Sequence, residues 1–345
     1  MKAYFNNRIK NEKEVFMKIL VTGGAGYIGS TTCTALINSG HEPIILDSLA
    51  TGNIDFLKDR THYIGDIANE KLVSEIIEKH EIETCIHFAA RIQVEESMQK
   101  PFLYYNENVV KSINFFETIK NNGIKNVIFS SSASVYNSKD SFKVDEYSPL
   151  KPISPYAKTK MIMELALEDF TNSDFKAITL RYFNPIGACV NGFSGPYAAE
   201  PSHLLGKLVN AAVSNKTFEI YGTNWGTIDG TAIRDYIHVQ DLANAHILAC
   251  EKFKEIENNY EVINVGTGTG VTVKEFVNSF IKVNGDIKIK EAPRRAGDAI
   301  GAYADCTKAE KLLGFKTVYT IEQGIRDALK WHSTSVSKIK SKTNL

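Results

Sequence analysis

Short apolar runs alternate with amphipathic stretches through the first half of the chain. The apolar runs are typical of buried strands, and they lie at residues 17–21, 43–46, 62–64, 85–88, 127–129 and 177–180. Helical spacing of apolar positions predicts helices at 28–39, 104–119 and 155–170. Strands and helices in alternation predict an α/β fold with a doubly wound parallel sheet, which binds ligands at the carboxyl ends of its strands.

This alternation changes after residue 184. Glycine-rich loops and short mixed elements follow, and they predict a smaller α+β part that caps the sheet. We therefore divide the chain into a polar N-terminal extension (1–16), a sheet domain (17–184), a capping domain (185–332) and a basic tail (333–345). The boundary near residue 184 is approximate, because the chain can cross back.

Composition narrows the class of protein. The chain of 345 residues is 43% hydrophobic and 23% charged, which fits a soluble globular protein of one large domain or two ordinary ones. Its formal net charge is zero, so nothing favours nucleic acid or an anionic membrane as a partner. No apolar run approaches about 18 residues, and no membrane span is expected. Five scattered cysteines without a C-x-x-C or H-E-x-x-H motif indicate reduced thiols in a cytoplasmic enzyme that holds no metal.

The run TGGAGYIG, which begins at residue 22, follows the first predicted strand and opens the first predicted helix. Gly23 allows a tight turn, Gly26 lets the backbone approach a pyrophosphate, and Gly29 lets helix and strand pack closely. The helix N-terminus then points its free N–H groups at the phosphates. Asp47 ends the second predicted strand, where a carboxylate accepts hydrogen bonds from ribose hydroxyls and repels a 2′-phosphate. These features predict a Rossmann-type site for NAD rather than NADP.

A second motif predicts proton transfer. Tyr156 and Lys160 lie four positions apart on one predicted helix, and the strand before it ends in a serine cluster that includes Ser132. A phenol has an ordinary pKa of about 10, and a nearby ammonium together with the positive nicotinamide ring lowers it by stabilising the phenolate. A tyrosine and a lysine at this spacing occur often by chance. Their position after the glycine loop and the serine-ended strand is what indicates transfer of hydride to or from a carbon that bears a hydroxyl.

A closer resemblance is carried by the stretches at 21–30, 86–90, 129–136, 154–156, 180–188, 234–239 and 292–298. Through them the chain resembles the extended short-chain dehydrogenase/reductase family and, within it, the UDP-glucose 4-epimerases. The similarity runs from about residue 18 to about residue 332, and the last three stretches are much more specific than the glycine loop. Members of this family are commonly homodimers joined through two helices, which here would span 104–121 and 155–169.

The resemblance implies that residues 17–184 bind NAD and that residues 185–332 bind a UDP-sugar. NAD stays tightly bound while Tyr156 takes the proton of the sugar 4-hydroxyl and C4 gives hydride to the nicotinamide. The 4-keto sugar then turns over, and hydride returns to its opposite face, which interconverts UDP-glucose and UDP-galactose. Ser132 would position and polarise the 4-oxygen, and Lys160 would bind the nicotinamide ribose.

The same resemblance assigns residues to the two ligands. For the cofactor it implies Gly23, Gly26, Tyr27, Ile28, Gly29, Asp47, Ser48, Asp66, Ile67, Phe88, Ala89, Ala90, Asn108, Ser130, Tyr156, Lys160 and Phe183. For the UDP-sugar it implies Ser132, Tyr156, Asn184, His203, Leu204, Tyr221, Arg234, Arg295, Asp298 and Ala302. The two arginines suit a pyrophosphate, because guanidinium groups bind phosphate oxygens in pairs. His203 could equally be a packing residue or a helix-cap residue.

Three positions depart from the family pattern. Ile92 stands where some epimerases carry a lysine that contacts the cofactor, and Arg91 beside it is a candidate substitute. Glu107 stands where asparagine is common. Ala302 falls where the family has either a tyrosine or a small residue, and a small residue leaves room for a 2-acetamido group. We hypothesise that the chain also interconverts UDP-N-acetylglucosamine and UDP-N-acetylgalactosamine.

Other functions remain as alternatives. A nucleotide-sugar 4,6-dehydratase would have Asp-Glu after the serine position, where this chain has Ala133 and Ser134. A net reductase would need exchangeable NAD(P)H. A non-catalytic regulator that binds NAD or a UDP-sugar would be expected to lose Tyr156 or Lys160, and this chain keeps both.

Overall fold

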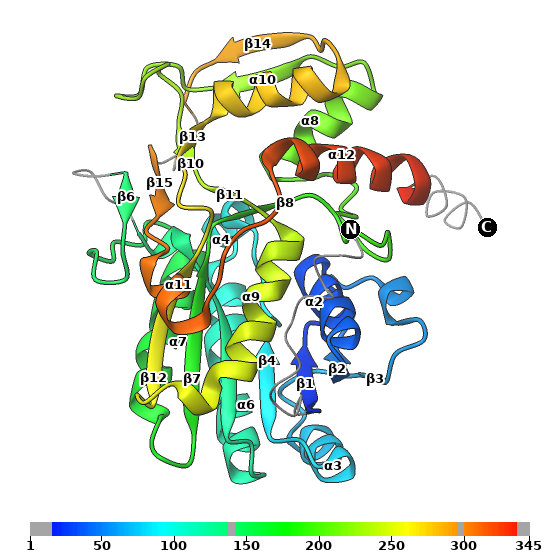
Figure 1. Ribbon diagram of the computed structural model, residues 1–345, viewed down its shortest axis with the longest axis vertical. Helices are drawn as coiled ribbons and strands as arrows, with labels where there is room; N and C mark the ends of the chain where they lie inside the picture. Colours follow the sequence, from blue (N-terminus) through cyan, green and yellow to red (C-terminus); the bar gives the residue numbers. More distant parts are fainter. Residues whose placement is uncertain (1–15, 137–141, 295–299, 337–345) are drawn as a thin grey trace.

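The computed structural model, which describes residues 16–136, 142–294 and 300–336, is built on a seven-stranded parallel sheet (Figure 1). The strand order is β12-β7-β5-β4-β1-β2-β3. These strands are β1 (Lys18–Thr22), β2 (Glu42–Asp47), β3 (His62–Ile64), β4 (Thr84–His87), β5 (Asn126–Ser132), β7 (Lys176–Tyr182) and β12 (Tyr260–Val265). The doubly wound sheet predicted from the sequence is confirmed. Its order reverses between β1 and β4, which is where such sheets bind ligands.

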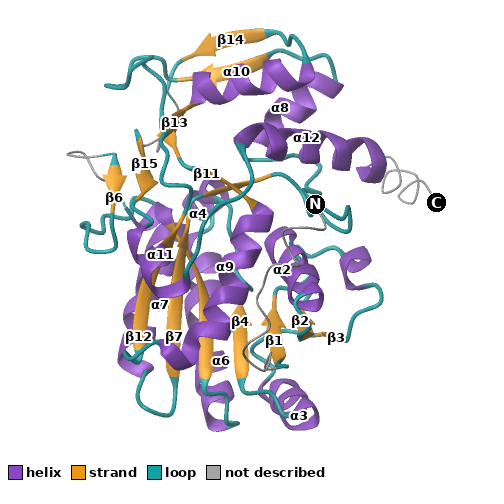
Figure 2. Cartoon of the chain, in the orientation of Figure 1, coloured by secondary structure: helices purple, strands orange, loops and turns teal. Residues whose placement is uncertain are grey.

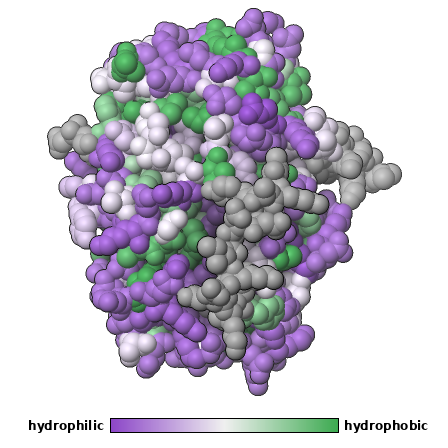
Figure 3. Space-filling view, in the orientation of Figure 1, coloured by the Kyte–Doolittle hydropathy of each residue, from purple (hydrophilic) through white to green (hydrophobic). Residues whose placement is uncertain are grey.

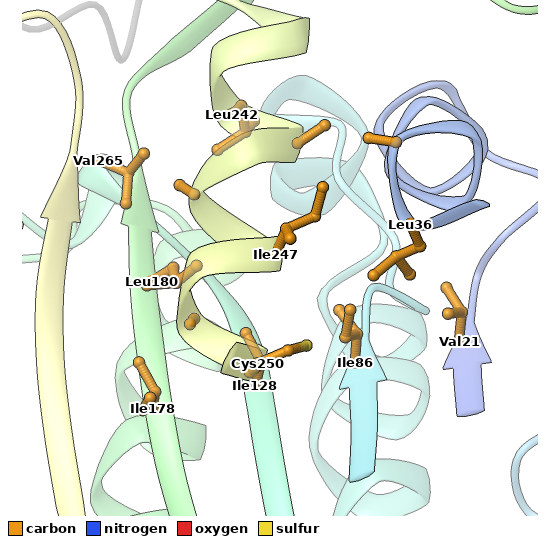
Figure 4. Close-up of a cluster of buried hydrophobic side chains, with 14 of the residues drawn as sticks. Val21, Leu36, Ile86, Ile128, Ile178, Leu180, Leu242, Ile247, Cys250 and Val265 are labelled. Carbon is orange, nitrogen blue, oxygen red and sulfur yellow. The ribbon is translucent and has the colours of Figure 1, made fainter. Parts of the chain in front are cut away.

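Helices cover both faces of this sheet. One face packs against α2 (Tyr27–Asn38), α9 (Val239–Lys252) and α11 (Thr307–Leu313), and the other against α3 (Glu70–His80), α6 (Lys111–Asn121) and α7 (Pro155–Phe170). Figure 4 shows Leu242 and Ile247 of α9 beside the strands that carry Leu180 and Ile128. Burying one such side chain contributes about 1.5–3 kcal/mol. The two apolar layers therefore hold the strand ends, and the loops that follow them, in fixed positions.

The chain returns to the sheet after it has begun the second part of the fold. β12 pairs with β7 along its whole length, from Tyr260 opposite Ala177 to Val265 opposite Tyr182. The predicted boundary at residue 184 therefore does not separate the two domains. Burial explains the return, because Ile263 and Val265 are fully buried where β12 covers the edge of β7. The predicted N-terminal extension and basic tail lie mostly outside the described residues.

A smaller α+β part caps the carboxyl ends of the sheet (Figure 2). Its strands form a sheet in the order β13-β10-β15-β6 and two separate pairs, β11 with β8 and β14 with β9. The elements are β6 (Lys143–Val144), β8 (Asn184–Ile186), α8 (Leu204–Val213), β9 (Phe218–Tyr221), β10 (Ile233–Arg234), β11 (Tyr236–His238), β13 (Val271–Thr272), α10 (Val273–Asn284), β14 (Ile289–Ala292), β15 (Gly301–Ala304) and α12 (Ile321–Trp331). The expected capping part is present, although β6 comes from the first half of the chain.

Two of the predicted helices show how far local sequence decides structure. The helix predicted at 155–170 has these bounds, because the Ser154 side chain accepts the Ala157 N–H at 3.2 Å and Pro155 occupies the first turn. The helix predicted at 104–119 is instead divided into α5 (Pro101–Tyr105), a π-helical turn η2 (Asn106–Val110) and α6. The turn η2 carries Asn108, whose buried side chain has partners outside the helix.

Hydrophilic residues cover most of the molecular face in Figure 3. Among the helices of the described ranges, none is long and apolar enough to cross a membrane.

Candidate active site

The glycine loop lies at the point where the strand order reverses. Gly23 follows β1 with a φ of +73°, and a Cβ at this position would lie 2.7 Å from the Ala89 nitrogen. A Cβ at Gly29 would overlap the Gly23 carbonyl oxygen. Gly26 precedes α2 as its N-cap residue, so the first N–H groups of α2 face the gap between β1 and β4. The loop therefore forms a cradle that only a chain without side chains at these positions can make, and its shape fits a pyrophosphate.

Two further residues of this motif face away from the cradle. Tyr27 donates its hydroxyl hydrogen bond to the Gly187 carbonyl at 2.7 Å, and Ile28 packs against the core beneath α2. Burial raises the pKa of Tyr27 well above its ordinary value. Tyr27 thus links the glycine loop to the loop after β8.

Asp47 occupies the end of β2 next to the glycine loop. Its Oδ2 accepts the Ala25 N–H at 2.9 Å, and its Oδ1 accepts the Leu49 N–H at 2.8 Å. Burial raises the pKa of this carboxyl, and the two backbone hydrogen bonds act in the opposite direction. Ser48 accepts a long hydrogen bond of 3.4 Å from Ala50 N–H. Each carboxylate oxygen of Asp47 can accept a further bond, as the predicted contact with ribose hydroxyls requires.

Beyond Asp47 on the same side of β1, Asp66 and Ile67 follow β3. The Asp66 carboxylate pairs with Lys111 at 2.6 Å and accepts the Ala68 N–H at 2.9 Å, while Ile67 is buried. Burial tends to raise the pKa of Asp66, but these hydrogen bonds bring it below its ordinary value. Lys111 also pairs with Glu107 at 2.9 Å. Glu107, which differs from the common asparagine, therefore belongs to an ion-pair network with Lys111 and Asp66. The sequence did not predict this network, because Lys111 is 45 residues from Asp66.

Hydrogen bonds from the Asn108 side chain hold the backbone of the segment that follows β4. This side chain accepts the Arg91 N–H at 2.8 Å, donates to the Arg91 carbonyl at 2.9 Å and donates to Thr159 Oγ1 at 3.1 Å. Phe88 and Ala89 lie against Gly23, and Ala90 follows them; the Phe88 N–H donates to the Thr22 carbonyl at 3.0 Å. Asn108 thus fixes the backbone of the expected cofactor site. The Ile92 side chain is 65% exposed.

The three predicted catalytic side chains meet at the carboxyl end of β5. Ser132 is the last residue of β5, and its hydroxyl is hydrogen-bonded to the Tyr156 phenol and accepts the Ser134 N–H at 3.2 Å. Tyr156 lies in the first turn of α7, and Lys160 follows one turn later on the same side. The Lys160 ammonium donates to the Ser130 carbonyl at 2.6 Å. The structure thus brings together the residues that the sequence predicts for hydride and proton transfer.

Burial dominates the electrostatics of this centre. It raises the pKa of Tyr156, and the hydrogen bond from Ser132 lowers it only in part. Burial also lowers the pKa of Lys160 to about 7, with Glu164 acting in the opposite direction. The lowering of the Tyr156 pKa by Lys160 together with a nicotinamide ring stays a prediction; here the ammonium is directed at the Ser130 carbonyl. Positive charge on a bound nicotinamide would act on the phenol against the effect of burial.

A buried polar network below these residues was missed in the sequence analysis. Arg181 Nη2 lies 2.6 Å from Glu164 Oε2, and both side chains are 4% exposed. Arg181 Nη1 also donates to the Tyr136 hydroxyl at 2.6 Å, and Tyr136 donates to Asn264 Oδ1 at 2.8 Å. Glu164 further accepts the Ser131 hydroxyl. The network joins α7, β5, β7 and β12 next to the predicted catalytic residues. The sequence signal that could have revealed it is an arginine within an apolar strand.

On the sugar side, β10 and β15 place two predicted residues together. Arg234 is paired with Ala302 in the parallel register of these strands. Its Nη1 donates to the Ile233 carbonyl at 2.7 Å and to the Ile300 carbonyl at 3.0 Å. Gly301 between them has a φ of +106°, and a Cβ there would overlap the Arg234 guanidinium. Ala302 belongs to the apolar cluster of Phe183, which follows β7 near the catalytic centre.

The remaining predicted residues lie along the capping part. Asn184 begins β8 and is exposed, Leu204 begins α8, and Tyr221 ends β9 with its hydroxyl 2.5 Å from Glu219. His203 is the N-cap residue of α8, where its Nδ1 accepts the Gly206 N–H at 3.1 Å. The helix-cap role considered for His203 is therefore present, and its contact with a substrate stays a prediction. Arg295 and Asp298 lie outside the described residues.

Comparisons with known proteins agree with this geometry. Residues 19–266 match the model of the NAD dependent epimerase/dehydratase family. UDP-glucose 4-epimerase of Bacillus subtilis is 38% identical over 338 residues, covering 94% of this chain and 99% of that protein. The structure of UDP-glucose-4-epimerase from Stenotrophomonas maltophila, with bound NAD and formylated UDP-arabinopyranose, aligns with a TM-score of 0.89 at 33% identity, covering 95% of this chain and 99% of that one.

A further solved structure is the UDP-Glc/GlcNAc 4-epimerase from Campylobacter jejuni, with a TM-score of 0.79 at 37% identity and coverage of 92% of this chain and 99% of that one. That enzyme is named for an N-acetylated sugar, GlcNAc, as well as for glucose. The glycine cradle, the centre of Ser132, Tyr156 and Lys160, and the family match over most of the chain lead to one conclusion. The chain belongs to the NAD-dependent epimerase/dehydratase family.

Proposed function

We propose that this protein inverts C4 of a UDP-hexose and thereby interconverts UDP-glucose and UDP-galactose. The observation that carries the proposal is the meeting of Ser132, Tyr156 and Lys160 at the end of β5, next to the glycine cradle. A 4,6-dehydratase needs an acid and a base after the serine. Ala133 and Ser134 supply neither group, so epimerisation remains the better reading.

The residues then divide the reaction between them. NAD bound in the cradle would accept hydride from C4 and return it to the opposite face of the ring. Tyr156 takes the proton of the 4-hydroxyl and gives it back, and Ser132 holds the 4-oxygen beside the phenol. Lys160 lies within α7 where a ribose hydroxyl can accept its hydrogen bond. Arg234 would hold the pyrophosphate, so that the keto sugar turns over without leaving.

The cofactor and substrate contacts of single residues are part of this proposal. The cradle of Gly23, Gly26 and Gly29, together with Asp47, supports the NAD assignment, since a side chain at Gly23 or Gly29 would clash with neighbouring backbone atoms and change the turn that would face a pyrophosphate. On the substrate side, the attachment of Arg234 to β15 supports its role, because it fixes the guanidinium in one orientation.

The test is to incubate the purified protein with UDP-galactose, without added NAD, and to separate the products by chromatography. Wild type is expected to form UDP-glucose. Tyr156→Phe is expected to lower the rate by about 10²- to 10⁴-fold, because it removes the proton-transfer group and leaves the ring. Failure of wild type to convert UDP-galactose, even after NAD is added, would contradict the proposal.

Acceptance of N-acetylated sugars is a second element of the proposal. Ala302 presents a single methyl group beside Arg234 and within the apolar cluster of Phe183. A 2-acetamido group needs space on this side of the sugar, and the small side chain supplies it. The relative from Campylobacter jejuni, which is named for both UDP-Glc and UDP-GlcNAc, supports this choice.

We also infer a homodimer from an exposed apolar surface. Met98 on α4 (Val94–Gln99), Phe102 on α5, Val110 on η2 and Leu165 on α7 are between 51% and 91% exposed. These helices pack against one another, so the side chains lie on neighbouring elements. Apolar side chains concentrated in this way favour burial against a second copy. This surface includes both helical regions predicted for the interface.

A cytoplasmic location completes the proposal. All five cysteines lie in the described ranges as free thiols, and four of them are buried. Such thiols persist where glutathione and thioredoxin keep proteins reduced. Cell fractionation is expected to recover the protein with cytoplasmic markers. Recovery with markers of an oxidising compartment would contradict the proposed location.

A further inference from the structure

The loop between β8 and α8 leaves the capping part and lies against the nucleotide-binding part. In Figure 1 it lies between α12 and α2. Near its start, the Gly187 carbonyl accepts the Tyr27 hydroxyl at 2.7 Å, and further on the Ser194 and Thr31 hydroxyls lie 3.2 Å apart. Both Tyr27 and Thr31 belong to α2, whose N-terminus forms the glycine cradle. The loop thus follows the helix that the cofactor site depends on.

Tyr197 of this loop rests on the segment that follows Asp47. Its hydroxyl donates to the Thr51 carbonyl at 2.5 Å, and its ring meets Phe56 edge to face at 5.3 Å. The segment is also tied to the glycine loop, because the Asn53 N–H donates to the Ala25 carbonyl at 2.9 Å. Burial raises the pKa of Tyr197 to about 12, and the nearby charge of Asp47 adds to this effect. Tyr197 therefore covers the segment expected to face the adenosine ribose.

Trp331, at the end of α12, holds the loop in this position. Its Nε1 donates to the Pro196 carbonyl at 2.8 Å, and its ring lies 5.9 Å from Phe56. Gly195 lies so close to the indole that a Cβ there would be 2.6 Å from the ring. The tryptophan is 6% exposed. Three elements, the loop, α12 and the segment after β2, therefore meet around one aromatic cluster.

The Arg60 side chain also connects this loop to α2. The Arg60 guanidinium lies 3.8 Å from the centroid of the Phe193 ring, while its Nη1 donates to the Ser30 carbonyl at 2.9 Å. Arg60 thus bridges the loop to α2. A cation is attracted to the electron-rich face of an aromatic ring, so these contacts together favour one closed arrangement.

We propose that residues 193–197 form a clasp, locked by Trp331, that closes the adenosine end of the cofactor site and sets the rate at which NAD leaves. The proposal rests on the cofactor site assigned above. An adenosine held by Asp47 lies under the segment that Tyr197 covers, so its departure requires the clasp to open. Opening breaks contacts that are remote from Tyr156, and it therefore changes NAD dissociation without changing the chemical step.

The experiment follows radiolabelled NAD+ that is bound to the purified protein and chased with excess unlabelled NAD+. Tyr197→Phe removes only the hydroxyl, and Trp331→Phe removes the Nε1 donor while keeping an aromatic ring. Each is expected to release label about three- to tenfold faster, the effect of one hydrogen bond. The rate of UDP-galactose conversion at saturating NAD should stay within about twofold of wild type. Tyr147→Phe, at a tyrosine that is 87% exposed, is the matched control and should release label as wild type does.

Unchanged release from both clasp variants, with faster release from Asp47→Ala, would overturn the clasp and keep the cofactor site. Unchanged release from Asp47→Ala as well would overturn the cofactor placement and the clasp with it. A fall in conversion rate at saturating NAD, matched to the faster release, would also overturn the proposal, because it would show general damage rather than a faster exit.

Discussion

Arg234 and Ala302 are direct neighbours across the parallel strands β10 and β15. The guanidinium donates to the Ile233 carbonyl on β10 and to the Ile300 carbonyl directly before Gly301, and Ala302 packs against the apolar cluster that contains Phe183. The residue expected to hold the pyrophosphate and the residue expected to decide which sugar fits are therefore set by one strand pairing. Changing the size of residue 302 should alter sugar choice without moving Arg234.

Ala302→Tyr is expected to abolish conversion of UDP-N-acetylgalactosamine and to retain conversion of UDP-galactose, because the larger ring fills the space for the acetamido group. The measurement is kcat/KM for both substrates. Ala302→Ser, which keeps the side chain small, should retain both activities. Equal loss of both activities in Ala302→Tyr would contradict the role given to this position.

Ser132→Ala is expected to move the acidic limb of the pH profile of kcat/KM to higher pH. The Ser132 hydrogen bond lowers the pKa of Tyr156, so its loss raises that pKa and the phenolate forms at higher pH. Ser134→Ala is the control, because its buried hydroxyl has no hydrogen-bond partner among the described residues. A profile that falls in height without moving along the pH axis would count against this link.

Lys160→Met is expected to stabilise the protein freed of NAD. The pKa of Lys160 falls from 10.5 to about 7 on folding, so between these values the unfolded chain binds the extra proton and stability rises with pH. The substitution should remove this slope and add on the order of 2–4 kcal/mol near pH 6. Urea unfolding between pH 6 and pH 9 measures both effects. An unchanged slope would show that Lys160 titrates normally.

Arg181→Met should destabilise the fold by about 3–5 kcal/mol, because it leaves the Glu164 carboxylate buried without its partner. Adding Glu164→Gln should restore part of that loss. Lys125→Met is the matched control, since its ion pair with Glu83 is more than 60% exposed on both sides and should matter by less than about 1 kcal/mol. Equal urea midpoints for Arg181→Met and Lys125→Met would contradict the expectation that losing the buried ion pair costs more stability than losing the exposed one.

Phe102→Asp is expected to give a monomer, because it places a charge in the centre of the exposed apolar surface on α4, α5, η2 and α7. Light scattering after gel filtration measures the mass. Ile228→Asp changes a side chain that is also 91% exposed, but in the loop between β9 and β10, and should leave the dimer intact. A monomeric wild type, or loss of the dimer in both variants, would remove the support for this interface.

Local signals made part of the fold predictable from sequence. The bounds of α7 depend on Ser154 and Pro155, and the turn at Gly23 depends on a φ that glycine adopts without strain. The place of β12 in the main sheet was not predictable, because the run around Ile263 is equally compatible with either sheet. Burial against β7, a partner more than 80 positions earlier, decides it.

The candidate site, too, could be predicted from the sequence only in part. The motif that contains Tyr156 and Lys160 predicted the helix that carries both residues, but not the direction of the ammonium, which donates to the Ser130 carbonyl. Likewise, the bridge between Lys111 and Asp66 and the contacts of Asn108 join residues far apart in the sequence. Spacing along the chain carries no information about such pairs, since they depend on how the elements pack.

The return of the chain to the sheet at β12 has a consequence for synthesis on the ribosome. Until residue 265 has been made, the outer edge of β7 presents its backbone N–H and C=O groups beside apolar side chains such as Ile178 and Leu180. An edge of this kind is a template for pairing with another chain. Translation that stops between residues 184 and 265 would therefore yield a fragment that carries the glycine cradle and Tyr156 but is prone to aggregate.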